Sequence, residues 1–184
     1  MIYPIPVYPR PNIFRDTLLL STLVVVLIMD QFSKELVQQY LKLGEAFPDD
    51  GPLRLIHTTN SGGVFGVFPN QTVFLIIASF VGIAILILIY RSQPWPGQLV
   101  RLSLGLQLGG ATGNLLDRLR HGEVVDFIDV GPWPIFNVAD SSIVIGITIL
   151  GMFFLFSGHR GPLVLQDLSF SQEPLLWPVP DVGC

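Results

Sequence analysis

Residues 73–90 read VFLIIASFVGIAILILIY, an uncharged run rich in Ile and Leu. An α-helix rises about 1.5 Å per residue, so this run would be about 27 Å long, close to the thickness of a bilayer core. Of the 184 residues in the chain, 50% are hydrophobic and 13% are charged, and the mean hydropathy is +0.59. A soluble domain carries roughly 25% charged residues. The sequence therefore predicts a single-domain integral membrane protein.

Three further apolar runs lie at residues 17–29, 102–116 and 141–158. The run at 102–116 is the weakest because it contains Gly, Ser and Gln. It and the run at 17–29 are short for a bilayer unless their polar ends lie inside protein. We predict an all-α, four-helix transmembrane bundle over residues 16–158, between a proline-rich N-terminal tail at 1–15 and a C-terminal tail at 159–184.

The run at 17–29 has an alternative interpretation as the apolar region of a cleaved signal peptide. Arg10 and Arg15 provide the basic flank, but the residues that follow, DQFSK at 30–34, contain no small-x-small cleavage site. A retained helix is therefore favoured. With four helices, five of the ten Lys and Arg residues fall on each side of the membrane. The positive-inside rule thus leaves the orientation open.

Several classes of partner and cofactor are disfavoured by composition. The net charge is −4 and there is no basic block, so a nucleic-acid partner is not expected. The single cysteine, Cys184, excludes an internal disulfide and multi-cysteine metal motifs. His57, His121 and His159 are isolated and lack the spacing of a zinc protease.

The polar residues gather at one end of the predicted bundle. In an up-and-down arrangement, the end of the first helix, the start of the second, the end of the third and the start of the fourth share one membrane face. The segments at these places are DQFSK (30–34), HTTNSGG (57–63), GNLLDRLRHG (113–122) and FNVAD (136–140). Ionisable groups at the edge of a membrane are costly and usually mark a functional site.

Two of these segments allow a structural or a functional interpretation. Asp30 and Lys34 are four residues apart, so an ion pair on one helix face is available, either inside a site or as a plain anchor at the helix end. Residues 60–63, Asn-Ser-Gly-Gly, are typical of a turn. Asn60 belongs either to an ordinary loop or to a site in which its amide meets an extended peptide.

The third predicted helix carries two patterns. Gly105, Gly109 and Gly113 recur every four residues, a spacing that lets helix backbones touch in lipid and predicts that this helix is the central one. Asn114, Asp117 and Arg118 then share one helix face. Either Arg118 is part of a site, or it only extends to the membrane surface.

Asp126 and Asp140 are the strongest candidates for chemistry. Asp126 lies in an apolar, strand-like stretch, VVDFI at 124–128, and Asp140 lies at the start of the fourth helix. Asp140 has an alternative role as a helix N-cap, although Ser141 would serve equally well. Two carboxylates in a low-dielectric site do not both ionise easily, so one holds a proton while the other acts as a base toward water. This pair predicts hydrolysis of a peptide bond.

Two other function classes remain as alternatives. A Ser–Lys protease would need a serine facing Lys34, and the adjacent Ser33 does not face it on a helix, which leaves Ser61. A small transporter would place polar groups along a path through the membrane. Here they collect at one face, which disfavours transport.

Four segments carry a family resemblance: DQFSKELV at 30–37, NSGGVFGVF at 60–68, GGATGNLLDRLRHGEVVDFID at 109–129 and FNVADSSIVIG at 136–146. They resemble the lipoprotein signal peptidases, or signal peptidase II, which are aspartic proteases of the bacterial inner membrane. The resemblance covers about residues 16–158. The chain departs from the family pattern at Gly63-Val64, where the family usually has alanines. The resemblance implies that Asp126 and Asp140 form the catalytic pair. The further functional positions it implies are Asp30, Lys34, Asn60, Asn114, Arg118 and Asn137.

The same resemblance implies the substrate and the setting. The substrate would be a diacylglyceryl-modified prolipoprotein, cut just before its lipidated cysteine, with membrane lipid as the other partner. No metal or organic cofactor is expected, because water is the nucleophile. The site would face the periplasm and both termini the cytoplasm. Residues 41–68, in which Leu53, Leu55 and Ile56 stand among polar neighbours, would form a small extracytoplasmic β element.

Overall fold

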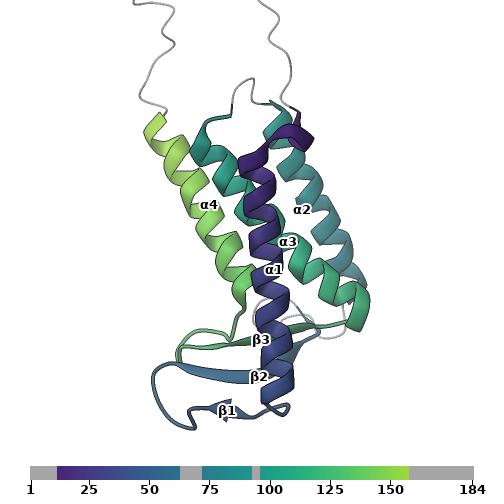
Figure 1. Ribbon diagram of the computed structural model, residues 1–184, viewed down its shortest axis with the longest axis vertical. Helices are drawn as coiled ribbons and strands as arrows, with labels where there is room; N and C mark the ends of the chain where they lie inside the picture. The colour runs from purple at the N-terminus through teal and green to yellow at the C-terminus, as the bar shows by residue number, and fades with distance from the viewer. Residues whose placement is uncertain (1–11, 63–71, 93–95, 158–184) are drawn as a thin grey trace, which may run out of the picture.

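The computed structural model describes residues 12–62, 72–92 and 96–157 (Figure 1). The helices are α1 (Thr17–Tyr40), α2 (Thr72–Ser92), α3 (Gln98–His121) and α4 (Val138–Ser157), with a 3-10 turn, η1 (Ile13–Arg15), before α1. A small antiparallel sheet of β1 (Ala46–Phe47), β2 (Arg54–Asn60) and β3 (Val124–Asp129) lies at one end of the bundle. The predicted C-terminal tail, most of the N-terminal tail and the Gly63-Val64 departure lie outside the described residues.

Helices form at all four predicted places, but α1, α3 and α4 begin or end elsewhere than expected. α1 continues beyond residue 29 to Tyr40, and α3 extends the predicted 102–116 at both ends. Among the described helices, α1, α2 and α4 are long and apolar enough to cross a membrane. α3 is not, because buried polar residues such as Ser103 and Gln107 lower its apolar content. A fourth membrane span is therefore not shown by length and composition.

α3 is the central helix, as its glycine spacing predicts. α1 crosses in front of it in Figure 1, with α2 and α4 on opposite flanks. A Cβ on Gly105 would lie 2.9 Å from the Leu19 carbonyl oxygen, and one on Gly109 would lie 2.9 Å from the Leu23 carbonyl oxygen. The glycine row of α3, Gly105, Gly109 and Gly113, thus lets the backbones of α1 and α3 approach each other closely.

A second set of glycines was not anticipated from the sequence. A Cβ on Gly110 would overlap the Ala139 carbonyl oxygen, and one on Gly146 would lie 2.8 Å from the Ser103 carbonyl oxygen. α3 and α4 therefore also meet through glycine. The sequence analysis missed this contact because Gly110 and Gly146 lie on different helices and share no local spacing.

A polar contact ties the helices together at the end away from the sheet. Asp16 caps α1 by accepting a hydrogen bond from the Leu19 amide. Its other oxygen accepts from the Tyr90 hydroxyl of α2 at 2.8 Å and pairs with Arg101 of α3 at 3.3 Å. This buried carboxylate fixes the spacing of three helices far from the polar end.

The predicted β element is present in β1 and β2, and it gains a strand from a distant part of the chain. β3 pairs with β2 so that Thr58 faces Asp126 and Asn60 faces Val124. α3 ends at Gly122, whose φ of 79° is left-handed and whose amide donates to the Arg118 carbonyl oxygen. That turn directs the chain from α3 into β3.

The glycine contact between α1 and α3 can be tested at Gly109. We expect Gly109→Ala to lower the midpoint of thermal unfolding in detergent, because overpacking a helix contact costs about 1–3 kcal/mol. The control is Gly151→Ala on α4, where a Cβ would meet nothing within 4 Å. Unchanged stability with lost activity in the Gly109 variant would mean that the row lines a substrate groove instead.

Candidate active site

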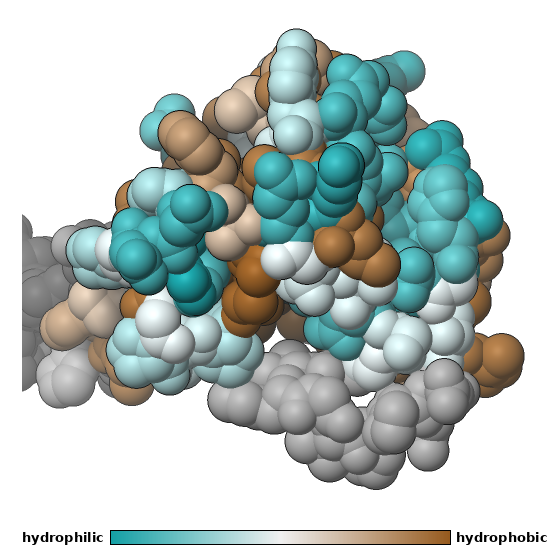
Figure 2. Space-filling model, turned by 90° about the horizontal axis from the view of Figure 1, so that it is seen from below, coloured by the Kyte–Doolittle hydropathy of each residue, from teal (hydrophilic) through white to brown (hydrophobic). Residues whose placement is uncertain are grey.

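A cavity of about 350 Å³ opens where α3 and α4 meet the sheet. Viewed from the sheet end, the described surface is mainly hydrophilic, with a hydrophobic area near its centre (Figure 2). The cavity is lined by polar residues from four elements and by an apolar wall. These residues are Asn60, Asn114, Arg118, Val124, Asp126, Trp133, Pro134, Ile135, Phe136, Asp140, Ile143 and Val144.

Asp126 reaches the cavity from the most buried strand. Val125 and Phe127 on either side of it are buried, so β3 is covered on both faces. Both carboxylate oxygens of Asp126 accept hydrogen bonds, one from the Asn137 side chain at 2.7 Å and the other from the Asn60 side chain at 3.1 Å. The antiparallel register explains the second contact. Thr58 lies opposite Asp126, and Asn60, two residues further along β2, lies on the same face of the sheet.

The charge on Asp126 is disfavoured by its surroundings. Burial raises the pKa of the Asp126 carboxyl to about 6, and the negative charge of Asp140 acts in the same direction. The amide donors of Asn60 and Asn137 and the charge of Lys34 oppose this rise in pKa. Asp126 can therefore hold a proton at a pH where an ordinary aspartic acid has lost it.

Asp129, on the same strand, has the opposite environment. It accepts the Gly131 amide and pairs with Arg54 of β2, and these contacts hold the pKa of its carboxyl below the ordinary value. Asp129 does not line the cavity. Of the two acids of β3, only Asp126 combines a raised pKa with access to the cavity.

Asp140 lies in the first turn of α4. The Asn137 side chain accepts a hydrogen bond from the Asp140 amide at 2.9 Å, and the Asp140 carboxylate accepts from the Asn137 amide at 3.3 Å. This reciprocal pair is a capping box, and it explains why α4 begins at Val138. The interpretations of Asp140 or Ser141 as the N-cap are wrong, because Asn137 occupies that position.

Asn137 also connects the two acids. It is completely buried, and its amide group donates to Asp126 while its carbonyl oxygen caps α4 beside Asp140. The second oxygen of Asp140 accepts from the Asn114 side chain at 2.8 Å. Each carboxylate is therefore oriented by side-chain amides from other parts of the chain.

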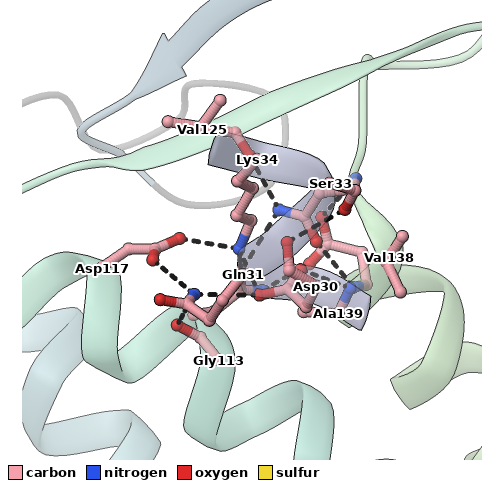
Figure 3. A network of polar contacts seen from close by, with 12 residues as sticks. Asp30, Gln31, Ser33, Lys34, Gly113, Asp117, Val125, Val138 and Ala139 are labelled. Atoms are coloured by element: carbon pink, nitrogen blue, oxygen red, sulfur yellow. Dashed lines mark hydrogen bonds and ion pairs between the residues drawn. The ribbon is translucent and has the colours of Figure 1, made fainter. Parts of the chain in front are cut away.

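Behind the acids, the ammonium group of Lys34 lies between α1 and α3 (Figure 3). Its nitrogen is 2.8 Å from a carboxylate oxygen of Asp30, 2.7 Å from one of Asp117 and 2.9 Å from the side-chain oxygen of Asn114. The ion pair predicted from the spacing of Asp30 and Lys34 is confirmed. It is not a plain anchor at the helix end, because both residues are buried and Lys34 also holds two residues of α3.

Asp30 extends this cluster to α4. Its second oxygen accepts a hydrogen bond from the Ala139 amide at 2.9 Å, next to Asp140. The neighbouring Gln31 donates to Asp117 at 2.8 Å. The sequence places Asp117 on the polar face of α3 but does not predict it as a site residue. It gives no signal for Gln31, because only the tertiary structure brings Gln31 to Asp117.

Arg118 lines the cavity together with both acids, and one guanidinium nitrogen donates to the backbone carbonyl oxygen of Asn114 at 3.3 Å. Its side chain is partly buried. The structure thus brings every predicted site residue to one end of the bundle. Asn60, Asn114, Arg118, Asp126 and Asp140 line the cavity, and Asp30, Lys34 and Asn137 hold them from behind.

The Ser–Lys alternative finds no support in the described residues. The hydrogen-bond partners of the Lys34 nitrogen are Asp30, Asn114 and Asp117, and neither Ser61 nor another described serine is among them. Ser33 donates to the Asp30 carbonyl oxygen, and Ser141 donates to the Asn137 carbonyl oxygen. The described part of the chain also contains no group of three or more His, Cys, Asp or Glu side chains able to hold a metal ion.

Comparison with known proteins identifies close relatives. The family model described as signal peptidase (SPase) II matches residues 22–156. A lipoprotein signal peptidase of Moorella thermoacetica is 46% identical over 133 residues, covering 69% of this chain and 85% of the relative. One from Halothermothrix orenii is 41% identical over 128 residues, covering 69% of this chain and 88% of the relative.

Solved structures show the same fold. A bacterial membrane enzyme determined by the in meso method at 2.3 Å resolution matches with a TM-score of 0.75 and 26% sequence identity, covering 86% of this chain and 98% of that chain. A second structure, at 1.9 Å resolution, has a TM-score of 0.70 and 28% identity, covering 82% of this chain and 98% of that chain. The molecule is therefore a membrane protein and a peptidase, not a transporter, and the chain belongs to the signal peptidase II family.

Proposed function

We propose that this chain is an aspartic endopeptidase of the bacterial inner membrane that removes signal peptides from diacylglyceryl-modified prolipoproteins, cutting before the lipidated cysteine. Membership of the signal peptidase II family supports the substrate. The observation that carries the catalytic type is that Asp126 and Asp140 line one cavity and are joined through Asn137.

The two acids have different roles in this proposal. Asp126, whose pKa is raised to about 6, carries the proton at the start of the reaction. Asp140 lies in the first turn of α4 and lines the same cavity. Asp140 takes a proton from water as the water oxygen attacks the scissile carbonyl, and Asp126 protonates the carbonyl oxygen. The proton on Asp140 then passes to the leaving nitrogen as the C–N bond breaks, and Asp126 takes back a proton from one hydroxyl of the diol, which becomes the new carboxyl group.

The other site residues act by positioning. Asn60, Asn114 and Asn137 orient the two carboxylates through their side-chain amides. Lys34 and Asp30 hold Asn114 and the start of α4 in place. Arg118, exposed to the same cavity, is available to bind a carbonyl oxygen of the substrate.

We further infer that α3 is the fourth membrane span, within a peptidase domain of residues 16–158 flanked by tails at 1–15 and 159–184. Large apolar side chains such as Val25, Phe80 and Ile147 are exposed on α1, α2 and α4, as expected for contact with lipid. α3 lies among these helices, and its polar residues Ser103, Gln107, Asn114 and Asp117 are buried in protein. In this arrangement the acids face the periplasm, and the start of α1 and the end of α4, at the opposite end of the bundle, are on the cytoplasmic side.

The catalytic pair is tested by Asp126→Asn and Asp140→Asn. Each change keeps the shape of the side chain but removes its ability to exchange a proton, so we expect turnover to fall by about 10³-fold or more. The assay is cleavage of a lipid-modified precursor by purified protein in lipid vesicles. Asp129→Asn, on the same strand but outside the cavity, is the control. Near-wild-type turnover of either cavity variant would contradict the assignment.

The raised pKa of Asp126 also has a consequence for stability. The unfolded carboxyl loses its proton near pH 3.8 and the folded one near pH 6. Ionisation of Asp126 therefore opposes folding above pH 6 and has no effect below pH 3.8. We expect Asp126→Asn to raise the melting temperature, relative to wild type, more at pH 8 than at pH 4.

Asp129→Asn provides a control of opposite sign for the melting measurement. The pKa of Asp129 is lowered, so its charge stabilises the fold at high pH and this contribution is lost as the pH falls through its folded pKa. This variant should lose more melting temperature at pH 8 than at pH 4. The same pH trend in both variants would show that Asp126 is not held in its protonated form.

Variants of Arg118 distinguish a contact with the substrate from a role at the membrane surface. A guanidinium donates two parallel hydrogen bonds that lysine does not reproduce, so we expect Arg118→Lys to lower kcat/KM about tenfold and Arg118→Leu to lower it further. The position of the cut, read by mass spectrometry, should not change. Equal kcat/KM for wild type and Arg118→Lys would place Arg118 outside the site.

A further inference from the structure

A separate groove lies at the end of the bundle away from the sheet, between the start of α1 and the end of α2 (Figure 1). Its volume is about 600 Å³. α1 and α2 each pack against α3, and neither packs extensively against the other, so α3 forms the floor between them. The lining residues are Asn12, Ile13, Phe14, Leu19, Leu20, Leu23, Ile83, Ile87, Arg91, Leu108 and Thr112.

The walls and the floor of this groove are mainly apolar. Each of the three helices contributes two residues four positions apart, which share one helix face. These pairs are Leu19 and Leu23, Ile83 and Ile87, and Leu108 and Thr112. Leu19 and Leu108 belong to the buried core, whereas Leu23, Ile83 and Ile87 are only partly buried against it. The described residues thus leave an apolar surface uncovered between α1 and α2.

The dimensions of the groove decide what fits. Its lining on α2 runs from Ile83 to Arg91, about 12 Å at 1.5 Å per residue. The volume of about 600 Å³ over that length leaves a cross-section of about 50 Å², whereas a helix 10–12 Å wide needs about 80–110 Å². Hydrocarbon chains therefore fit this groove, and the transmembrane helix of a partner does not.

One end of the groove is positively charged. Arg91 lines it and is exposed at the end of α2, and Arg15 is exposed just before α1. Of the described acids, only Asp16 lies at this end of the bundle, and it is buried and paired with Arg101. Among the described residues, neither Arg15 nor Arg91 has an ion-pair partner. An apolar groove that ends beside two such arginines matches a ligand with a hydrocarbon chain and a negatively charged head.

We propose that this groove binds one anionic phospholipid of the surrounding membrane, with an acyl chain between α1 and α2 and the phosphate next to Arg91. A guanidinium donates charge-assisted hydrogen bonds to phosphate oxygens. Arg15 and Arg91 together favour a head group of net negative charge over a zwitterionic one, which carries a cation of its own. The bound lipid would join two helices that pack little against each other. This inference requires only a membrane protein, so it is independent of the proposed catalysis.

The role of Arg91 is tested by native mass spectrometry of the purified chain with phosphatidylglycerol or phosphatidylcholine of identical acyl chains. We expect wild type to retain one phosphatidylglycerol about fivefold more tightly than phosphatidylcholine. Arg91→Gln should remove this preference, and because Arg91 is exposed the variant should stay folded. Lys42→Gln, which removes one exposed charge at the sheet end, should keep the preference. No preference in wild type, an unchanged preference in Arg91→Gln, or an equal loss in both variants would overturn the inference.

The groove itself is tested by Ile87→Trp, which fills it from α2. Leu88, the next residue, is 65% exposed and does not line the groove, so Leu88→Trp is the matched control. We expect Ile87→Trp to weaken retention of phosphatidylglycerol about fivefold or more, and Leu88→Trp to leave it unchanged. Equal retention by the two tryptophan variants would place the lipid outside the groove and overturn the inference.

Thermal unfolding in detergent distinguishes the lipid from other occupants. Phosphatidylglycerol should raise the melting temperature of wild type and raise that of Arg91→Gln less, because a ligand that binds only the folded state stabilises it. Inorganic phosphate should have no effect, and an equal rise with phosphate alone would indicate a site for a free ion. A lipid-free dimer of wild type that Ile87→Trp does not form would show that a second copy of the chain fills the groove. Either of these two results would overturn the inference.

Discussion

The buried ammonium group of Lys34 is the interaction on which the rest of the site depends. Moving a charged group out of water costs several kcal/mol, and only close partners in good geometry offset that cost. Lys34 has three such partners, Asp30 on its own helix and Asn114 and Asp117 on α3. The same Asn114 donates to Asp140, so the position of a candidate catalytic carboxylate follows from how the cation is enclosed.

This enclosure requires that the helices approach closely. Lipid tails are as apolar as leucine, so no hydrophobic effect draws helices together inside a membrane, and packing and hydrogen bonds must do so. A Cβ at Gly113 would meet the Asp30 carboxylate, and one at Gly110 would overlap the backbone beside Asp140. The glycines of α3 are therefore part of the site, because they set the distances at which its hydrogen bonds form.

The sequence predicts those contacts of the fold and the site that join residues close together along the chain. The pairing of Asp30 with Lys34 and the glycine row of α3 follow from helical spacing, and both are present. The pairing of β2 with β3 joins residues more than sixty positions apart, and the double role of Asn137 needs α4 and β3 together. Gln31 has no local signal at all, because its partner Asp117 is on another helix. Contacts between residues distant in sequence depend on tertiary packing, so the spacing of residues along one helix or strand does not predict them.

The difference between the two acids comes from their secondary structure. Asp126 lies in a strand covered on both faces, and the loss of water there raises the pKa of its carboxyl. Asp140 lies in the first turn of α4, and its carboxylate accepts hydrogen bonds from the Asn137 backbone amide and the Asn114 side chain.

Among the described residues, no buried side-chain nitrogen or oxygen lacks a hydrogen-bond partner. The cost of the site thus lies in burying charge and not in unmade hydrogen bonds. Because Asn137 donates to one acid and caps the helix of the other, the strand and the helix must move together, so the acids keep their geometry while their proton is exchanged.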